Sequence, residues 1–260
     1  MRVCLLLLLA AACDFSVTAK GPLPSQDAAV AVAGPSRDGL VAWWHFDDRG
    51  DPYRDEGGGV ALVARGGAQV SGKVGLAYDF DGATCLTAAD SPAFRGAGAS
   101  ALSVAAWVRV PSGGCPQDRL DAGYVNVGVI FSKDGEYEHG VYCGPTPAYQ
   151  HAVSTDGAGG EWLWRGSAPV STGDWHHVAT AWDGAAVRLY VDGTLAEARV
   201  LTGVVRPAFG SSGVGVGCGG VPADGASTAM YNFVGTIDEV LVYRRALSAE
   251  EVAAYYGATR

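Results

Sequence analysis

Three acidic residues at alternate positions are the first candidates for catalytic chemistry. Asp134, Glu136 and Glu138 lie in the segment KDGEYEHG, each two residues from the next. On a β-strand such side chains share one face, so two of them could act as a general acid and base. The Asp134-Gly135 pair, however, is typical of a hairpin turn, where carboxylates are ordinarily solvated. The sequence therefore favours a solvated turn over a catalytic pair.

Histidine, serine and glycine patterns provide no catalytic set either. His176 and His177 are adjacent, so on a strand they point to opposite faces and cannot hold one ion; we expect one to be packed and the other hydrogen-bonded. No G-x-S-x-G segment is present to anchor a serine hydrolase. Residues 215–220 satisfy G-x-G-x-x-G, but no helix is expected after them to hold a pyrophosphate. We therefore predict that the protein is not an enzyme.

The elements that would position any site are predicted to be strands. Segment 175–193, WHHVATAWDGAAVRLYVDG, contains two strand-like runs around one Asp-Gly turn and ends on a second. Apolar residues alternate with polar ones in its second run, and the same alternation occurs in 72–82, 101–110 and 237–243. This pattern predicts antiparallel strands with one apolar face.

Only one helix is predicted in the folded part, in the segment ALSAEEVAAYY near the C-terminus. Ser248 and Glu251 have the spacing of a capping box, and Leu247 and Val252 can form a hydrophobic staple. Gly257 is expected to end the helix. One short helix after a long series of strands indicates an all-β fold.

The chain resembles the laminin-G-like, concanavalin-A-like jelly-roll domains of secreted bacterial proteins. The resemblance rests on seven segments in order, from Gly39 to about Tyr256: LVAWWHFDD, GKVGLAYDFDG, ADSPAF, LSVAAWVRV, VIFSKDG, GDWHHVATAWDGAAVRLYVDG and VGTIDEVLVYRRALSAEEV. It implies an antiparallel jelly-roll sandwich of two sheets with a short C-terminal helix. Such folds support many functions, so the fold alone assigns none.

The resemblance also implies a structural calcium ion that ties the N-terminal strand to the last strand. Asp47 and Asp238 occupy the matching positions, with Asp48 as an alternative and the turn at Gly82 as a possible neighbour. Oxygen ligands of this kind favour Ca²⁺ over a transition metal. The alternative is that these are surface carboxylates near strand ends.

Aromatic residues are the candidates for ligand binding. Trp162 and Trp164 are two residues apart on a predicted strand, so their rings should face the same way, and Tyr149 and His151 repeat this spacing in a nearby segment. On an open sheet the two indoles would form a stacking surface for sugar rings. If that face points inward, they are core residues instead.

The N-terminus is predicted to be a targeting segment. Arg2 precedes an apolar run that is too short to span a bilayer, so residues 1–12 are expected to be a signal peptide. The Ala-Ala-Ala-Cys sequence that ends at Cys13 permits either ordinary cleavage or lipidation of Cys13 as in a bacterial lipoprotein. Residues 13–37 are expected to be a flexible tether, and residues 38–257 the jelly-roll domain.

Cysteine parity favours lipidation. If Cys4 leaves with the signal and Cys13 carries lipid, four cysteines remain, an even set suited to two disulfides in an oxidising compartment. Four cysteines permit three pairings, of which we favour Cys115–Cys143 with Cys85–Cys218. No pair has the C-x-x-C spacing of a zinc site.

Charge and composition narrow the function further. The formal net charge is −9 and no Lys/Arg-rich run occurs, which argues against nucleic-acid binding. We therefore predict a non-catalytic recognition or adhesion module, held on the bacterial cell envelope by a lipid anchor, that binds a glycan or a cell-surface protein. The alternatives are a jelly-roll glycoside hydrolase or polysaccharide lyase and a purely structural envelope domain. The E-x-D-x-x-E pattern of the related hydrolases is absent.

Overall fold

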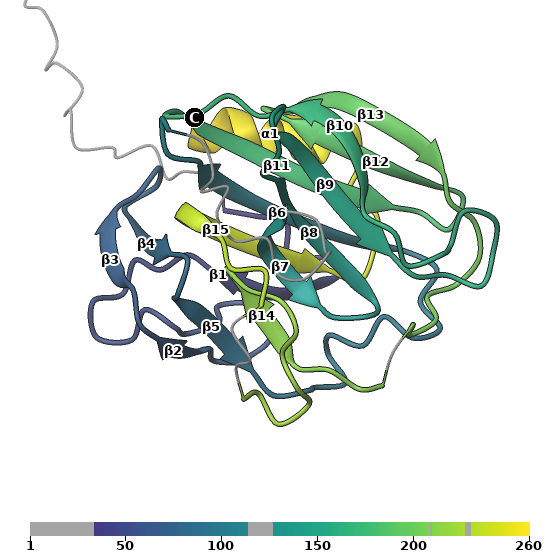
Figure 1. Ribbon diagram of the computed structural model, residues 1–260, viewed down its shortest axis with the longest axis horizontal. Helices are drawn as coiled ribbons and strands as arrows, with labels where there is room; N and C mark the ends of the chain where they lie inside the picture. Colours follow the sequence, from purple (N-terminus) through teal and green to yellow (C-terminus); the bar gives the residue numbers. More distant parts are fainter. Residues whose placement is uncertain (1–33, 114–126, 209, 227–229) are drawn as a thin grey trace, which may run out of the picture. The chain divides into compact units, whose positions relative to one another are not determined.

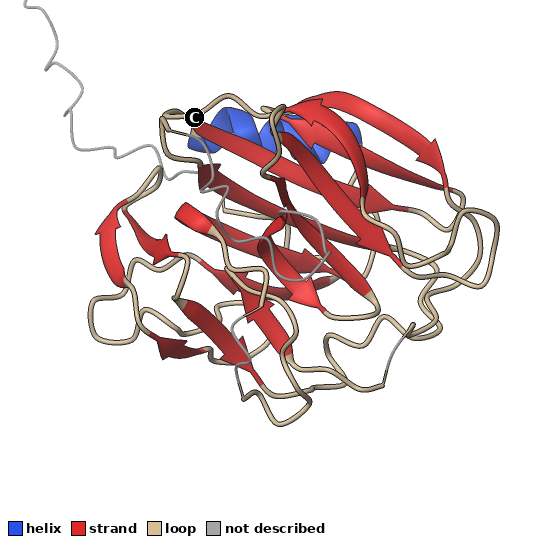
Figure 2. Cartoon of the chain, viewed as in Figure 1, coloured by secondary structure: helices blue, strands red, loops and turns tan. Residues whose placement is uncertain are grey.

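A computed structural model describes residues 34–113, 127–208, 210–226 and 230–260. By its internal contacts the chain divides into Met1–Val32 and Ala33–Arg260, and all described residues belong to the second unit. Figures 1 and 2 show this unit as two layers of strands with one helix in the described part. The predicted all-β, two-sheet jelly roll is confirmed.

All pairings between the strands are antiparallel, in an eight-stranded and a seven-stranded sheet. The eight-stranded sheet consists, in spatial order, of β13 (Thr194–Val200), β12 (Ala186–Val191), β11 (Trp175–Trp182), β6 (Leu102–Arg109), β15 (Val234–Tyr243), β4 (Leu76–Asp81) and β3 (Ala68–Ser71), with β1 (Leu40–Trp44) also paired to β15. The seven-stranded sheet consists of β10 (Arg165–Pro169), β9 (Ala148–Val153), β8 (Tyr137–Tyr142), β7 (Val127–Lys133), β14 (Val214–Val216), β5 (Cys85–Ala88) and β2 (Val63–Arg65).

The main core lies between the two sheets, because the strands alternate as the sequence predicts. On β11, Val178 and Trp182 point into this core, whereas Ala179 and Ala181 belong to a second cluster on the outer face of the eight-stranded sheet. Burial of apolar side chains at roughly 25 cal/mol per Å² makes these two clusters the main source of stability. The outer cluster is buried only because a helix covers it.

That helix is α1 (Ala249–Thr259), and its start follows the prediction. Ser248 is the N-cap, and its side chain and that of Glu251 form the reciprocal capping box. The predicted end at Gly257 is wrong, because the helix continues to Thr259. The Thr259 hydroxyl donates to the Tyr255 carbonyl and accepts the Trp107 indole N–H, which fixes the last turn on the sheet.

One predicted disulfide is present. Cys85 and Cys218 are bonded with their Cα atoms 5.4 Å apart, so the start of β5 is tied to the loop after β14. Cys143 is also disulfide-bonded. Its predicted partner Cys115 lies outside the described residues, as does Cys13 with its predicted lipid.

Among the described residues, no helix is long and apolar enough to cross a membrane.

Candidate functional site

A row of four side chains crosses the outer face of the eight-stranded sheet. Trp175 on β11 is directly opposite Arg109 on β6, and Arg109 is opposite Thr236 on β15. Thr236 is in turn opposite Asp79 on β4. Because directly opposite residues in antiparallel strands point to the same side, these four side chains share one face. The face therefore carries an aromatic ring, a guanidinium, a hydroxyl and a carboxylate in line.

Contacts within the row are loose. The Arg109 guanidinium stacks over the Trp175 ring at 5.0 Å, and Arg109 Nη2 donates to Thr236 Oγ1 at 3.3 Å. Thr236 Oγ1 donates to Asp79 Oδ1 at 3.5 Å. Optimal hydrogen bonds of these types are about 2.7–3.0 Å long. The guanidinium and the carboxylate therefore keep capacity for hydrogen bonds to a ligand.

The row borders an open cleft of about 330 Å³, which we call the polar cleft; it is lined by Asp79, Arg109, Val110, Pro111, Ser112, Gly173, Gly235 and Thr236. Gly235 has φ +132°, and a Cβ at this position would lie 2.3 Å from the Arg109 carbonyl oxygen. Only glycine therefore lets β15 approach β6 so closely at the cleft. Backbone shape and polar side chains together define this cavity.

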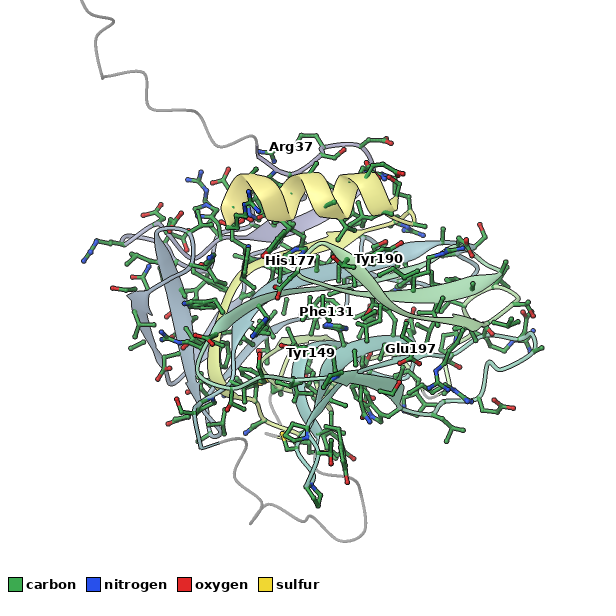
Figure 3. The ribbon with its side chains drawn as sticks, turned by 90° about the horizontal axis from the view of Figure 1, so that it is seen from above. Arg37, Phe131, Tyr149, His177, Tyr190 and Glu197 are labelled. Atoms are coloured by element: carbon green, nitrogen blue, oxygen red, sulfur yellow. A yellow bond between two sulfur atoms is a disulfide. The ribbon has the colours of Figure 1, made fainter. Side chains whose placement is uncertain are left out.

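The next row of side chains along the same face is covered by helix α1. Trp107, His177 and Asp238 are aligned across β6, β11 and β15, two residues along from the polar row, and all three are buried. Trp107 and His177 contact the ring of Tyr256 on α1, and Figure 3 shows His177 just beneath the helix. The open polar row therefore lies beside a helix-covered one.

Sequence reasoning missed this site. The alternation in 72–82 and 101–110 predicts strands with polar residues on one side, among them Asp79 and Arg109, but no role was assigned to these residues. Strand pairing between β4, β6, β11 and β15 joins segments up to about 160 residues apart, and alternation within one strand does not reveal that register. The outward-facing polar residues Asp79, Arg109 and Thr236, each on a different strand, were the available signal.

The predicted tryptophan pair does not lie on a strand. Strand β10 begins at Arg165, the first residue paired with β9, so Trp162 and Trp164 lie in the irregular segment just before it. Both are half-buried. The Trp164 ring lies 3.3 Å from where a Cβ on Gly140 would be, against the face of β8 that points away from the core. Strand alternation therefore does not align these rings, and this part of the prediction is wrong.

Tyr149 does not join the tryptophans. It is 1% exposed, lies in the core between the sheets, and is opposite Val141. As Figure 3 shows, it sits with Phe131 on the far side of the eight-stranded sheet from the helix. The prediction of Tyr149 as a ligand contact is therefore corrected, because its strand face points inward.

The two aspartates predicted to hold calcium converge on one turn. Asp238 Oδ2 accepts the backbone N–H groups of Lys73 and Val74 at 2.9 and 3.0 Å, and Asp47 Oδ1 accepts that of Leu76 at 2.5 Å. Burial raises the pKa of Asp238 to about 8, against the lowering effect of these amides. Its other oxygen, Oδ1, is buried with no hydrogen-bond partner in the described structure. That orphaned oxygen fits a cation ligand.

Other members of the predicted calcium site lie elsewhere or are engaged. Gly82 follows β4 at its far end from Leu76, roughly 20 Å along the strand, and its carbonyl accepts the Asn232 side chain at 2.9 Å. Gly82 is therefore not a neighbour of Asp238, which corrects that prediction. Asp48 Oδ1 caps its own turn by accepting Gly50 N–H at 2.8 Å. Over the described ranges, no group of three or more His, Cys, Asp and Glu side chains could hold a metal, so an ion here would need backbone oxygens.

The acidic triplet separates into two environments. Glu136 Oε2 accepts the backbone N–H groups of Gly96 and Ala97, so this carboxylate has a structural role. Glu138 is 4% exposed, and its Oε1 accepts the Ser132 hydroxyl at 2.6 Å. Burial first, and then the charge of Asp134, raises the pKa of Glu138. Asp134 and Glu138 are therefore a partly buried carboxyl pair rather than the freely solvated turn that the sequence favoured.

The adjacent histidines behave as predicted, one packed and one hydrogen-bonded. His176 Nε2 contacts Ser171 Oγ at 2.5 Å, and its Nδ1 contacts Asp192 Oδ2 at 2.8 Å. This order of groups resembles a nucleophile, base and orienting carboxylate. Neither Ser171 nor His176 lines the polar cleft, however. The chain of contacts ties the β10–β11 connection to the turn after β12.

Comparison by sequence adds a family. The family model Laminin_G_3, described as the concanavalin A-like lectin/glucanases superfamily, matches residues 81–253, well over half of the 260 residues. No curated protein matches the sequence.

Solved structures with a similar fold include a domain of a glycan-degrading enzyme and the binding domains of two toxins. Domain 4 of AbnA, a GH43 extracellular arabinanase from Geobacillus stearothermophilus in complex with arabinotriose, has a TM-score of 0.59 and 20% identity over 84% of this chain and 98% of that domain. The binding domain of Paraclostridial Mosquitocidal Protein 1 has a TM-score of 0.61 and 15% identity, and that of botulinum neurotoxin serotype G 0.57 and 14%. The match covers 85% and 84% of this chain but only about half of each toxin domain (52% and 50%).

Proposed function

Because the chain belongs to the concanavalin A-like lectin/glucanases superfamily, we propose that it is a non-catalytic module that binds a glycan in the polar cleft. The observation that carries the proposal is the line of Trp175, Arg109, Thr236 and Asp79, the last three of which line an open cavity. An aspartate accepts two sugar O–H groups and an arginine donates to two oxygens, so the pair suits vicinal hydroxyls. The tryptophan supplies a face or edge for a sugar ring.

A glycan fits this cleft better than a protein does. Stable protein interfaces bury about 800 Å² on each partner, around an apolar and aromatic centre. The polar cleft is small and is lined mainly by polar side chains and glycine. Among the structural neighbours, domain 4 of AbnA was solved with arabinotriose, which supports an oligosaccharide as the first ligand to test. We expect a dissociation constant of about 0.1–1 mM, or roughly −4 to −5.5 kcal/mol.

We also propose the setting and the stabilising ion. The Cys85–Cys218 disulfide supports an exported protein, because such bonds persist in oxidising compartments. Lipidation of Cys13 would hold the module on the cell envelope. A Ca²⁺ ion could be held by Asp238 Oδ1, which has no hydrogen-bond partner among the described residues, together with Asp47 and backbone oxygens. It would fix the turn from Lys73 to Leu76, whose N–H groups both aspartates accept.

The test is a glycan panel that includes arabinotriose, measured by calorimetry with and without chelator. Asp79→Asn and Arg109→Met should each weaken binding of any hit about ten-fold or more, since each removes charge-assisted hydrogen bonds. Asp183→Asn and Arg188→Met are the matched controls. The side chains of Asp183 and Arg188 are hydrogen-bonded to each other, and neither residue lines the polar cleft. Binding that survives both cleft variants, or a panel with no hit, contradicts the glycan proposal.

A second candidate function is glycoside hydrolysis. It is favoured by the Asp134–Glu138 pair, in which the raised pKa of Glu138 keeps a proton available near neutral pH, as a general acid requires. A turnover assay on a polysaccharide panel decides the question. Product formation that disappears in Glu138→Gln would establish the enzyme and overturn the non-catalytic proposal.

A further inference from the structure

A second cavity opens at one edge of the sandwich, between the two sheets. Its volume is about 260 Å³, and its walls come from β9 and β10 of one sheet and from β12 and β13 of the other. We call it the intersheet cavity and define it by His151, Val153, Leu163, Val187 and Val200. It does not share a residue with the polar cleft.

The walls and mouth of this cavity are largely apolar. Val153 and Val187 are core residues that reach it from opposite sheets. At the mouth, Leu163 is 53% exposed and Val200 is 74% exposed. Exposed aliphatic side chains around a preformed cavity are typical of a site that takes an apolar group.

One wall contains a buried polar group without a partner. His151 is 2% exposed, and neither ring nitrogen has a hydrogen-bond partner in the described residues. Leaving a buried donor or acceptor unpaired costs about 1–3 kcal/mol. Burial lowers the pKa of His151 to about 4, so the ring is neutral at pH 7 and offers one N–H donor. A ligand atom that reached the ring would satisfy it, once the side chains that now close both nitrogens from solvent had shifted.

Two arginines, each paired with one glutamate, stand on the two walls. Arg165 is directly opposite His151 across β9 and β10, and Arg199 is directly opposite Val187 across β12 and β13. Arg165 is bonded to Glu161 at 3.1 Å, and Arg199 is paired with Glu197. Both acidic partners lie outside the lining of the cavity, which contains no carboxylate of its own.

We propose that the intersheet cavity is a binding site for a small amphiphilic carboxylate. Its hydrocarbon part would lie between Val153 and Val187, and its carboxylate would accept hydrogen bonds from His151 and from the arginine side chains. The volume is just below the roughly 300 Å³ at which pockets for drug-sized ligands begin, so the ligand is a short chain or single ring. This site is separate from the proposed glycan site and would allow the module to bind two ligands of different chemistry.

The experiment is a calorimetric titration of the full chain with octanoate and, in parallel, with octan-1-ol. Octanoate should bind at least about ten-fold more tightly than the alcohol, since only the acid gains the charged hydrogen bonds. Saturable octanoate binding with this preference supports the proposal. No octanoate binding, or equal binding of the two compounds, overturns it.

Two variants locate the binding. Val200→Glu places a negative charge at the exposed mouth and should weaken octanoate binding about ten-fold, whereas Leu195→Glu is the matched control on the same strand, 50% exposed and outside the cavity. His151→Phe should also weaken binding, while its melting temperature should stay level or rise because an unpaired polar group is removed. Equal weakening by both glutamate variants, or none by Val200→Glu, overturns the assignment. Glycan binding should be unchanged in Val200→Glu, so the two site proposals fail separately.

Discussion

The buried ring of His177 makes a defined contribution to how stability depends on pH. It is 1% exposed, its centroid is 5.5 Å from those of Trp107 and Tyr255, and neither ring nitrogen has a partner in the described part of the chain. Burial lowers the pKa of His177 to about 4, against about 6.5 in the unfolded chain. The unfolded state therefore takes up this proton first as the pH falls.

The size of the effect follows from linkage. Between the unfolded value near 6.5 and the folded value near 4, each pH unit costs about 1.4 kcal/mol of folding free energy. Going from pH 7.5 to pH 5.0 crosses about 1.5 of these units, so the charge of His177 should cost about 2 kcal/mol. His177→Phe keeps an aromatic ring between Trp107 and Tyr255 and removes the titratable group. The stability of this variant relative to wild type should rise by about 2 kcal/mol over that interval.

Urea unfolding at pH 7.5, 6.0 and 5.0 measures this difference. Glu138→Gln is the control of opposite sign. Burial raises the pKa of Glu138, so the carboxyl of wild type destabilises the folded state at high pH and no longer does so at low pH. The advantage of Glu138→Gln over wild type should shrink as the pH falls. A constant gap between His177→Phe and wild type at all three pH values would refute the claim that His177 is buried as a neutral ring beneath α1.

Other consequences concern the ion, the disulfide and the helix cap. If Asp47 and Asp238 share a calcium ion, EDTA should lower the melting temperature by about 5–10 °C, and Asp238→Asn should abolish that response; an identical melting curve in EDTA contradicts the site. The Cys85–Cys218 bond closes a loop of 133 residues, so replacing both cysteines by alanine should lower the free energy of unfolding by about 5 kcal/mol through loop entropy. Urea unfolding of this double variant measures the loss. A loss below about 1 kcal/mol would show that the bond hardly constrains the unfolded chain. Ser248→Ala should cost about 1 kcal/mol, and an unchanged midpoint would mean that the capping box does not contribute to docking of α1.

Local patterns in the sequence were sufficient for the strands and the start of the helix. The alternation in segment 175–193 gave β11 and β12, and the spacing of Ser248 and Glu251 gave the cap of α1. Both depend on neighbours within a few residues, which the sequence displays directly. The end of α1 at Thr259 depends instead on a contact with Trp107, 152 residues away, and was missed.

The same distinction explains the outcome for candidate sites. Asp47 and Asp238 were paired through family resemblance, which reflects how distant segments meet in the fold. Both side chains do accept backbone N–H groups of one turn, at Lys73 and Leu76. Trp162 and Trp164 were aligned by strand parity, which fails because β10 starts only at Arg165, after both of them. The polar row was invisible because strand register across β4, β6, β11 and β15 arises only when the sheet forms.

Mapping of a bound glycan on the protein by amide chemical shifts tests the glycan-binding proposal most directly. With any oligosaccharide that binds, the largest shifts should cluster at Asp79, Arg109, Ser112 and Thr236 around the polar cleft. The same shifts in Asp79→Asn should need at least about ten-fold more ligand. Shifts centred instead on the segment that contains Trp162 and Trp164, with the cleft unaffected, would contradict the assignment of the binding face.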